Sequence, residues 1–477
     1  MKKGYKADGS ISIYLALTFT VMLSLILVII EGAREEAIRL KAECAVDLSL
    51  HSVFAEYNRE LLEQYDLFFI DTSYGLDHAS IHRTEEHLKA YLDDNFTLDQ
   101  GAGILKDLMA LYTEEAVITD YSLASDEMGI LIKRQAVSYM KDLFGAEYVS
   151  ELKRQLETVE GEGLLTRDVT SERLSNQSAL DSIEIPPKQV GEDEWVEVEL
   201  DNPADAVNAA RGNLSLVIDP EKGLSSAAID PANYISARIP NQGSGLAGRE
   251  GIGGGDEMIF NEYLIKKCGC YTQPKEEGGL QYQLEYILAG ESSDIENLKA
   301  VVNKLLLLRE TANVIYLFSD GAKMAEAEAL AIAVTAEIPV PGIEQLVKIS
   351  LIFAWAYAES VYDVRTLLKG GKIPLVKNAE TWHYSLSGML SFGGDEGGEI
   401  PDIEGVDYEG YLRMFLALEN VEQKTMRAMD IIEMDVRKCP GNAYFRLDTC
   451  VDRIKAEIHT ASNYGFSHEI TRSFYYY

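Results

Sequence analysis

Basic residues are scarce in this chain: 43 lysines and arginines stand against 78 aspartates and glutamates, which gives a formal net charge of −35. A surface this acidic repels phosphate groups, so we expect no nucleic acid among the partners. Charged residues make up 25% and apolar residues 47%, a globular balance that excludes a wholly disordered or collagen-like chain. At about 150 residues per domain, the length allows two or three domains.

Cysteine is scarce as well. The five cysteines are an odd and widely spaced set, which excludes a disulfide framework. Cys268 and Cys270 enclose a single residue, too few for a CxxC redox motif or half of a zinc site. A bond between Cys439 and Cys450 would close a small loop, and buried free thiols are the alternative.

The usual catalytic motifs are missing from the sequence. It contains no GxSxG, no HExxH and no P-loop. Acidic pairs are so frequent that no glycosidase-like pair of carboxylates stands out. We therefore predict a protein that is not an enzyme and that uses no cofactor, and an extracytoplasmic hydrolase without a known motif stays open as an alternative.

The most informative segment that is present is residues 11–30, which are apolar and carry no charge. A helix of this length spans the hydrocarbon core of a bilayer, about 30 Å. Lysines precede the segment and glutamates follow it, which places residues 1–10 in the cytoplasm as a short tail and the remainder outside. The apolar run is longer than that of a cleaved secretory signal, which favours a retained single-pass anchor in the cell membrane.

The segment that follows continues the helix. Residues 31–62 lack proline, and their apolar positions recur near the helical period. One helix should therefore leave the membrane and become the spine of a globular head, as in pilins. A later apolar run, residues 349–358, is too short to cross a bilayer and is predicted to be a core helix.

A family resemblance rests on these residues. Two segments, residues 9–17 and 39–47, resemble the N-terminus of TadE/TadG-like proteins, which take part in assembling tight-adherence (Flp-type) pili. The longer pattern is similar to an uncharacterised Gram-positive family associated with such loci, in four further segments: residues 63–71, 285–290, 354–360 and 425–430. The resemblance implies a minor component or assembly factor of such a pilus, with other pilin-like proteins as partners.

The resemblance also raises the question of processing. Prepilins cut after a glycine commonly have Glu at the fifth mature position, and with Ser10 as the first residue that position holds Tyr14. Cleavage between Gly9 and Ser10 is thus one hypothesis, and an uncleaved anchor is the other. Small residues at Ala16 and Thr20 would let a second copy approach closely in the lipid, which suggests homo-oligomers.

We predict an α+β fold: a long N-terminal helix and a mixed extracytoplasmic head that ends in a β-hairpin. Residues 31–160 should form the spine and a first subdomain, residues 161–255 a Gly-, Pro- and acid-rich insertion or linker, and residues 256–477 a second subdomain. Strands are predicted at residues 65–71, 116–122, 280–288, 453–459 and 466–474. Helices are predicted at residues 79–94, 126–157, 259–267, 293–308, 314–337, 343–368, 408–418 and 423–437.

One loop offers a candidate cation site. Asp71 and Ser73 begin a segment, ending at Gly75, that resembles the D-x-S-x-S metal loop of von Willebrand type A domains, and residues 314–321 resemble a later strand of that fold. The last serine of the motif is replaced by Gly75. The alternative function is therefore a surface adhesion or cation-dependent binding module, and an ordinary turn after a strand is the simpler interpretation.

Two other patterns have simpler explanations. His78, His82 and His87 have helical spacing that suits metal ligands, but a solvated helix face explains them. Residues 243–248 match GxGxxG, but no buried strand precedes them, so we interpret them as a flexible loop.

Overall fold

The computed structural model describes residues 8–97, 109–143, 147–189, 195–218, 223–244, 246, 253–391 and 403–476. Contacts divide the chain into two compact units. The first comprises Met1–Gln135, Pro240–Gly251 and Cys439–Tyr477, and the second comprises Ala136–Ile239 and Ile252–Lys438. The division falls inside helix α4 (Asp126–Leu143).

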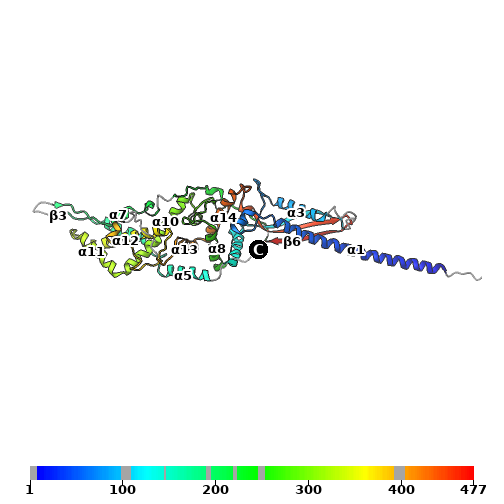
Figure 1. Ribbon diagram of the computed structural model, residues 1–477, viewed down its shortest axis with the longest axis horizontal. Coiled ribbons are helices and arrows are strands. Elements are labelled where there is room, and N and C mark those ends of the chain that lie inside the picture. The colour runs from blue at the N-terminus through cyan, green and yellow to red at the C-terminus, as the bar shows by residue number, and fades with distance from the viewer. Residues whose placement is uncertain are drawn as a thin grey trace, which may run out of the picture. The chain divides into compact units, whose positions relative to one another are not determined.

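The first unit is built on an antiparallel sheet with β5 at its centre (Figure 1). Strand β5 pairs with β2 on one side, and with β1 and β6 on the other. The strands are β1 (Ile70–Asp71), β2 (Leu111–Leu123), β5 (Cys450–Ser462) and β6 (Ser467–Tyr475). The helices are α1 (Asp8–Phe54), α2 (Arg59–Tyr65), α3 (Ile81–Phe96) and the short 3₁₀ turn η6 (Leu447–Thr449).

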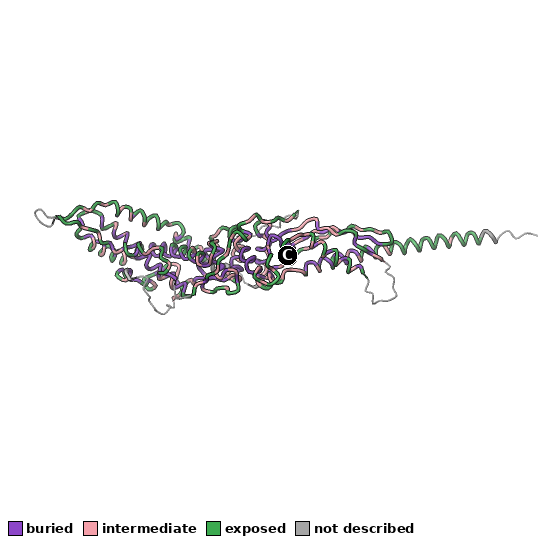
Figure 2. Tube along the Cα trace, turned by 90° about the horizontal axis from the view of Figure 1, so that it is seen from above, coloured by how far each residue is buried: buried purple, intermediate pink, exposed green. Residues whose placement is uncertain are grey.

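Helix α1 has two halves with different surroundings. Its second half carries a stripe of buried residues that includes Ile38, Ala42, Val46 and Val53, spaced at about one helical turn. This stripe joins residues of α3 and of the sheet in one hydrophobic core. Of the first half, every residue from 11 to 30 except the half-buried Thr18 is exposed in the part of the chain that the structure describes (Figure 2).

The second unit is largely helical, with a short two-stranded ribbon. Its helices are α5 (Glu147–Gly161), α6 (Val169–Asp181), α7 (Ala204–Ala209), α8 (Gly254–Lys267), α9 (Gln283–Ala289), α10 (Asp294–Ser319), α11 (Gly321–Thr335), α12 (Ile343–Leu368), α13 (Tyr408–Leu418) and α14 (Val421–Lys438). The ribbon pairs β3 (Lys188–Gln189) with β4 (Trp195–Val196). The 3₁₀ turns are η2 (Leu214–Leu216), η3 (Pro231–Asn233), η4 (Ile235–Ala237) and η5 (Gly388–Ser391).

The predicted mixture of helices and sheet is confirmed, with a long apolar N-terminal helix and C-terminal strands. Helices α12 and α13 have the predicted bounds, and residues 349–358 lie within the core as expected. At the start of α10, the backbone amide of Glu296 donates to Ser293 Oγ over 3.3 Å, which is half of a capping box. Gly465, at φ +86°, closes the predicted hairpin between β5 and β6.

Four predicted elements were wrong. The spine helix predicted over residues 31–62 ends at Phe54, and the separate helix α2 begins at Arg59. Residues 280–288 contain helix α9 and not a strand. The sequence pattern could not distinguish helix from strand here, because the residues from Gln283 to Leu288 are all buried and show no periodicity. The helix predicted over residues 314–337 breaks at Asp320, whose carboxylate caps α11. Of residues 65–71, only Ile70 and Asp71 form a strand.

The long insertion contains two helices, and the C-terminal hairpin lies in the first unit. Among the described residues of 161–255, helices α6 and α7 are short elements of the kind that the prediction of a linker allows. The C-terminal hairpin belongs with the N-terminal helix and not with residues 256–438, because β5 pairs with β1 and β2. Composition along the chain cannot show such a long-range pairing.

Candidate functional site

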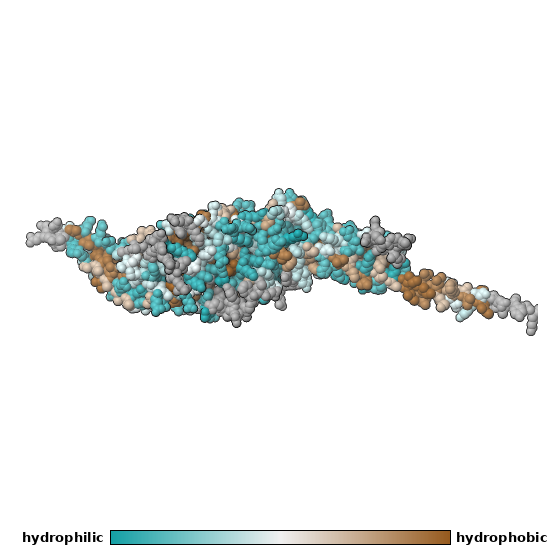
Figure 3. Space-filling model, in the orientation of Figure 1, coloured by the Kyte–Doolittle hydropathy of each residue, from teal (hydrophilic) through white to brown (hydrophobic). Residues whose placement is uncertain are grey.

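The first candidate is the apolar half of α1, residues 11–30, which we call the stem. Every large apolar side chain in it is exposed, and Figure 3 shows it as a hydrophobic stretch. Among the described residues, α1 is the one helix long and apolar enough to cross a membrane, and none of its most apolar part is buried. Exposure of this much apolar surface to water is unfavourable, so the stem needs an apolar environment.

Three hydroxyl groups on the stem donate hydrogen bonds within the helix. Thr20 Oγ1 donates to the carbonyl oxygen of Ala16 over 2.8 Å, and Ser24 Oγ donates to that of Thr20 over 2.8 Å. Thr18 Oγ1 donates to Tyr14 O over 3.0 Å. In lipid an unpaired hydroxyl costs free energy, and these bonds remove that cost. Gly9 and Ser10, the predicted processing site, lie in the first turn of α1.

The candidate cation loop is a closed turn. Both oxygens of the Asp71 carboxylate accept hydrogen bonds from Ser73: Oδ1 from its amide nitrogen over 2.9 Å, and Oδ2 from its hydroxyl over 2.8 Å. Burial raises the pKa of Asp71, and these two bonds oppose that rise. Gly75 adopts φ +80°, and an added Cβ would lie 2.8 Å from Gly441 O. The predicted partner strand at residues 314–321 is part of α10 and the cap of α11.

The histidines pair separately. His82 Nδ1 lies 2.7 Å from Glu85, and His87 Nδ1 lies 2.9 Å from Glu56. His78 lies 2.7 Å from Asp77. Over the described ranges, no three His, Cys, Asp or Glu side chains form a group arranged to hold a metal ion.

The glycine-rich motif has a structural role where it is described. The backbones of Ser244 and Tyr121 exchange two hydrogen bonds, and the Gly243 amide donates to Asp126 Oδ1 over 2.9 Å. A Cβ at Gly243 would lie 2.5 Å from Tyr121 O, so only glycine fits. Gly245 and residues 247–250 fall outside the described residues.

All five cysteines lie within the described residues as thiols, so Cys439 and Cys450 form no disulfide there. Gln64 Nε2 donates to Cys439 Sγ over 3.2 Å, and Cys450 Sγ donates to Arg446 O over 3.3 Å. Cys44 is exposed on α1.

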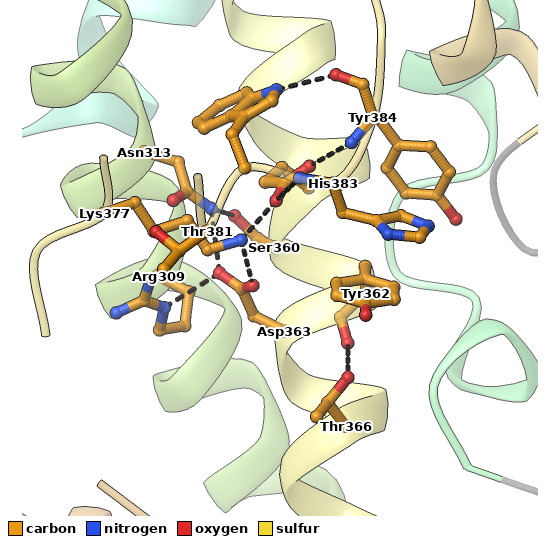
Figure 4. Close-up of polar contacts among 12 residues, drawn as sticks. Arg309, Asn313, Ser360, Tyr362, Asp363, Thr366, Lys377, Thr381, His383 and Tyr384 are labelled. Carbon is orange, nitrogen blue, oxygen red and sulfur yellow. Dashed lines mark hydrogen bonds and ion pairs between the residues drawn. The ribbon is translucent and has the colours of Figure 1, made fainter. Parts of the chain in front are cut away.

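The second unit contains a buried ionic cluster that the sequence did not reveal (Figure 4). Asp363 Oδ2 accepts from Arg309 Nε over 3.0 Å and from Asn313 Nδ2 over 3.1 Å. Lys377 Nζ lies 2.6 Å from Asp363 Oδ1 and also pairs with Glu359. All four charged side chains are at most 1% exposed. Two buried cations thus neutralise two buried anions.

The cluster also fixes the segment that follows α12. Glu359 accepts hydrogen bonds from the amides of His383 and Tyr384, each over 2.8 Å. The His383 ring stacks on Tyr362, with 3.7 Å between ring centroids. Burial opposes ionisation of Asp363, but the charges of Lys377 and Arg309 outweigh it and hold its pKa below the ordinary value. Each charged group pairs with another member of the cluster. The cluster therefore joins α10, α12 and the segment that follows α12.

Two further buried acids hold α9 and α14. Glu285 Oε1 accepts from the Tyr271 amide over 2.8 Å and from the Tyr408 hydroxyl over 2.7 Å, and burial raises its pKa to about 7. Asp430 accepts from the Ser236 amide over 2.9 Å and from the Tyr286 hydroxyl over 2.8 Å. Burial raises the pKa of Asp430 to about 6.

Comparison with known proteins gives a family without a known activity. The model of a family of unknown function, DUF5702, matches residues 193–462, more than half of the 477 residues. No curated protein and no solved structure matches the chain significantly. The match spans the buried ionic cluster, the acids of α9 and α14, and the whole of β5. The chain therefore belongs to the DUF5702 family of unknown function.

Proposed function

We propose that this protein is a non-enzymatic, single-pass membrane protein. Residues 11–30 span the bilayer, residues 1–10 lie in the cytoplasm, and the acidic remainder lies outside. It acts as a minor component or assembly factor of a Tad/Flp-type pilus. The observation that supports the anchor most is the stem: twenty uncharged helical residues, nearly all exposed, that continue directly into a helical segment packed on a folded unit.

The packing of α1 would connect the membrane anchor rigidly to the first unit. The same helix that would lie in lipid is held by its buried stripe to the central sheet of the first unit. Because a helix is stiff over this length, a force on the stem acts directly on that sheet. A pilin-like stem of this kind suits a protein that joins other stems in the membrane by helix packing.

The pilus role rests on the resemblance of residues 9–17 and 39–47 to TadE/TadG-like proteins. Deletion of the gene tests it: we expect fewer pili and weaker adhesion, with both restored by the wild-type gene. A complementing gene that lacks the stem serves as the control and should not restore either. Unchanged pili and adhesion in the deletion strain would count against the role.

Mass spectrometry of the purified N-terminus separates the two processing hypotheses. An intact Met1–Gly9 segment identifies an uncleaved anchor, and a chain that begins at Ser10 identifies a prepilin. The alternative of a cation-dependent binding module has no comparable support in the described residues, because both Asp71 carboxylate oxygens already accept hydrogen bonds from Ser73.

A further inference from the structure

The turn of the β5–β6 hairpin lies beside α1 where the stem ends. The Arg34 guanidinium carbon lies 4.4 Å from the centroid of the Tyr464 ring. Figure 1 shows this end of the hairpin alongside α1. Both residues belong to the first unit, so their relation is fixed within one compact body.

The distance from the stem places this contact at a definite depth. Arg34 is four residues beyond Ile30, about 6 Å along a helix. A bilayer has a hydrocarbon core of about 30 Å and a total thickness of about 40–45 Å, which leaves about 5–7 Å of headgroups on each side. Helical side chains lean toward the helix N-terminus, so the Arg34 guanidinium lies on the stem side of its own Cα. Tyr464 therefore falls in the headgroup layer whenever the stem fills the hydrocarbon core.

A second aromatic residue lies near the same turn. Tyr112 is paired with Ala461 across β2 and β5, next to the hairpin turn. Tyr464 is 40% exposed and Tyr112 is 43% exposed, although both are large aromatic residues. Tyrosine is enriched at membrane interfaces because its ring is apolar and its hydroxyl is polar.

We propose that this end of the first unit, formed by Arg34, Tyr112 and Tyr464, is a membrane-contact surface that inserts its two tyrosine rings among lipid headgroups. The proposal rests on the proposed function, since the depth of the surface is set by a stem that spans the bilayer. The contact gives the unit a second attachment beside the helix, which restricts its tilt and rotation on the membrane. Its partner is the zwitterionic or neutral headgroup layer, because the acidic chain is repelled by anionic lipid.

Quenching by brominated lipid tests the proposal on the full-length chain in phosphatidylcholine vesicles. Tyr464→Trp adds a fluorophore at the turn, and the three native tryptophans are subtracted with the wild-type protein. Tyr444→Trp is the matched control, because Tyr444 is an exposed tyrosine of the same unit. Tyr444 lies two residues after Asn442, and Asn442 contacts Asn58 just beyond the C-terminal end of α1. That end of α1 is about 30 Å from Arg34 along the helix, so Tyr444 is far from the proposed surface.

We expect the fluorescence added by Tyr464→Trp to fall by about half with lipids brominated near the headgroups, and by less with lipids brominated near the bilayer centre. The fluorescence added by Tyr444→Trp should not change with either lipid. Tyr112→Trp is a second variant of the surface and should behave as Tyr464→Trp does.

A variant at a third position tests the anchor independently of the membrane-contact surface. Phe19→Trp lies in the middle of the stem and should be quenched most by bromine near the bilayer centre. If Phe19→Trp is not quenched, the anchor is wrong. If Phe19→Trp is quenched while Tyr464→Trp and Tyr112→Trp behave as Tyr444→Trp does, the stem spans the bilayer and the membrane-contact surface is overturned. A second copy of the chain that covers the turn would also keep both tryptophans from the lipid, and this result would overturn the membrane-contact surface as well.

Discussion

The guanidinium of Arg309 on α10 and the carboxylate of Asp363 on α12 face each other in the interior of the second unit, with 3.0 Å between Nε and Oδ2. Neither side chain is more than 1% exposed. Buried charges of this kind are stable only while each keeps its partners, because an unpaired charge away from water is very costly.

Removal of Asp363 should therefore destabilise the second unit strongly. Asp363→Ala leaves Arg309 and Lys377 with only Glu359 as a counter-charge, and we expect a loss of about 3–5 kcal/mol in the free energy of unfolding. Urea denaturation of the full-length protein in detergent measures it. The control is Glu344→Ala on the same helix, where the exposed side chain should change stability by about 1 kcal/mol or less. Equal effects of the two substitutions would show that the cluster is not structurally important.

Glu285 should make the second unit more stable in mild acid. Burial raises the pKa of Glu285 in the folded state to about 7, above its value in the unfolded chain. At a pH between these two pKa values, the folded state therefore binds more protons than the unfolded state. The contribution is fully present below the unfolded pKa of about 4.3 and is lost as the pH rises toward 7. At neutral pH the loss amounts to roughly 3 kcal/mol, an order-of-magnitude value.

Glu285→Gln tests this contribution because the amide does not titrate and its oxygen still accepts from Tyr271 and Tyr408. We expect the variant to lose part of the pH dependence between about pH 4.5 and 7, and to become the more stable protein near pH 7. Thermal unfolding at several pH values, compared with wild type, measures the difference. Parallel curves for the two proteins would contradict the buried ionisation.

The Asp71 turn predicts a response that does not depend on cations. Asp71→Ala removes both hydrogen bonds with Ser73 and should lower the unfolding free energy by about 1–3 kcal/mol. The same loss is expected with and without Ca²⁺ or Mg²⁺, and neither cation should bind in calorimetry. Binding of either cation that disappears in Asp71→Ala would favour the cation-dependent module instead.

A charge in the stem should prevent membrane insertion, whereas the same charge further along α1 should not. Leu23→Arg places a guanidinium near the middle of the apolar run, at a cost of about 2.5–3.5 kcal/mol for insertion. Leu40→Arg is the control on the same helix, at a side chain that is 63% exposed and beyond the stem. Alkaline extraction of membranes should release the first variant and retain the second. Retention of both variants would mean that the stem does not hold the protein in lipid.

The sequence predicted the fold where local patterns decide it. Helices α12 and α13 have a clear beginning and a long helical pattern, and their bounds were predicted correctly. Helix α9 was mistaken for a strand because all its residues from Gln283 to Leu288 are buried, which leaves no polar face to define a period. The pairing of Ile70 with Val451 joins distant parts of the chain and was not predictable from local patterns.

The candidate sites show the same limit. The stem needs only composition and length, so it could be identified from the sequence. The ionic cluster joins Arg309 to a residue 54 positions away, and only the packing of two helices reveals that pairing. Its one local trace is Glu359 and Asp363, two acids a helical turn apart at the end of an apolar segment. The residues of the Asp71 loop suit a metal loop and an ordinary turn equally well. Only the structure, in which Ser73 donates to the Asp71 carboxylate, distinguishes the two.

Labelling of Cys44 in intact cells tests the central claim most directly. This thiol is exposed on α1, fourteen residues beyond the stem. A maleimide that cannot cross membranes should label it in intact cells, should label it no further after permeabilisation, and should give no such signal with Cys44→Ser. Labelling of Cys44 only after permeabilisation, or recovery of the full-length chain from cytosol without detergent, would contradict an anchor that places the acidic remainder outside the cell.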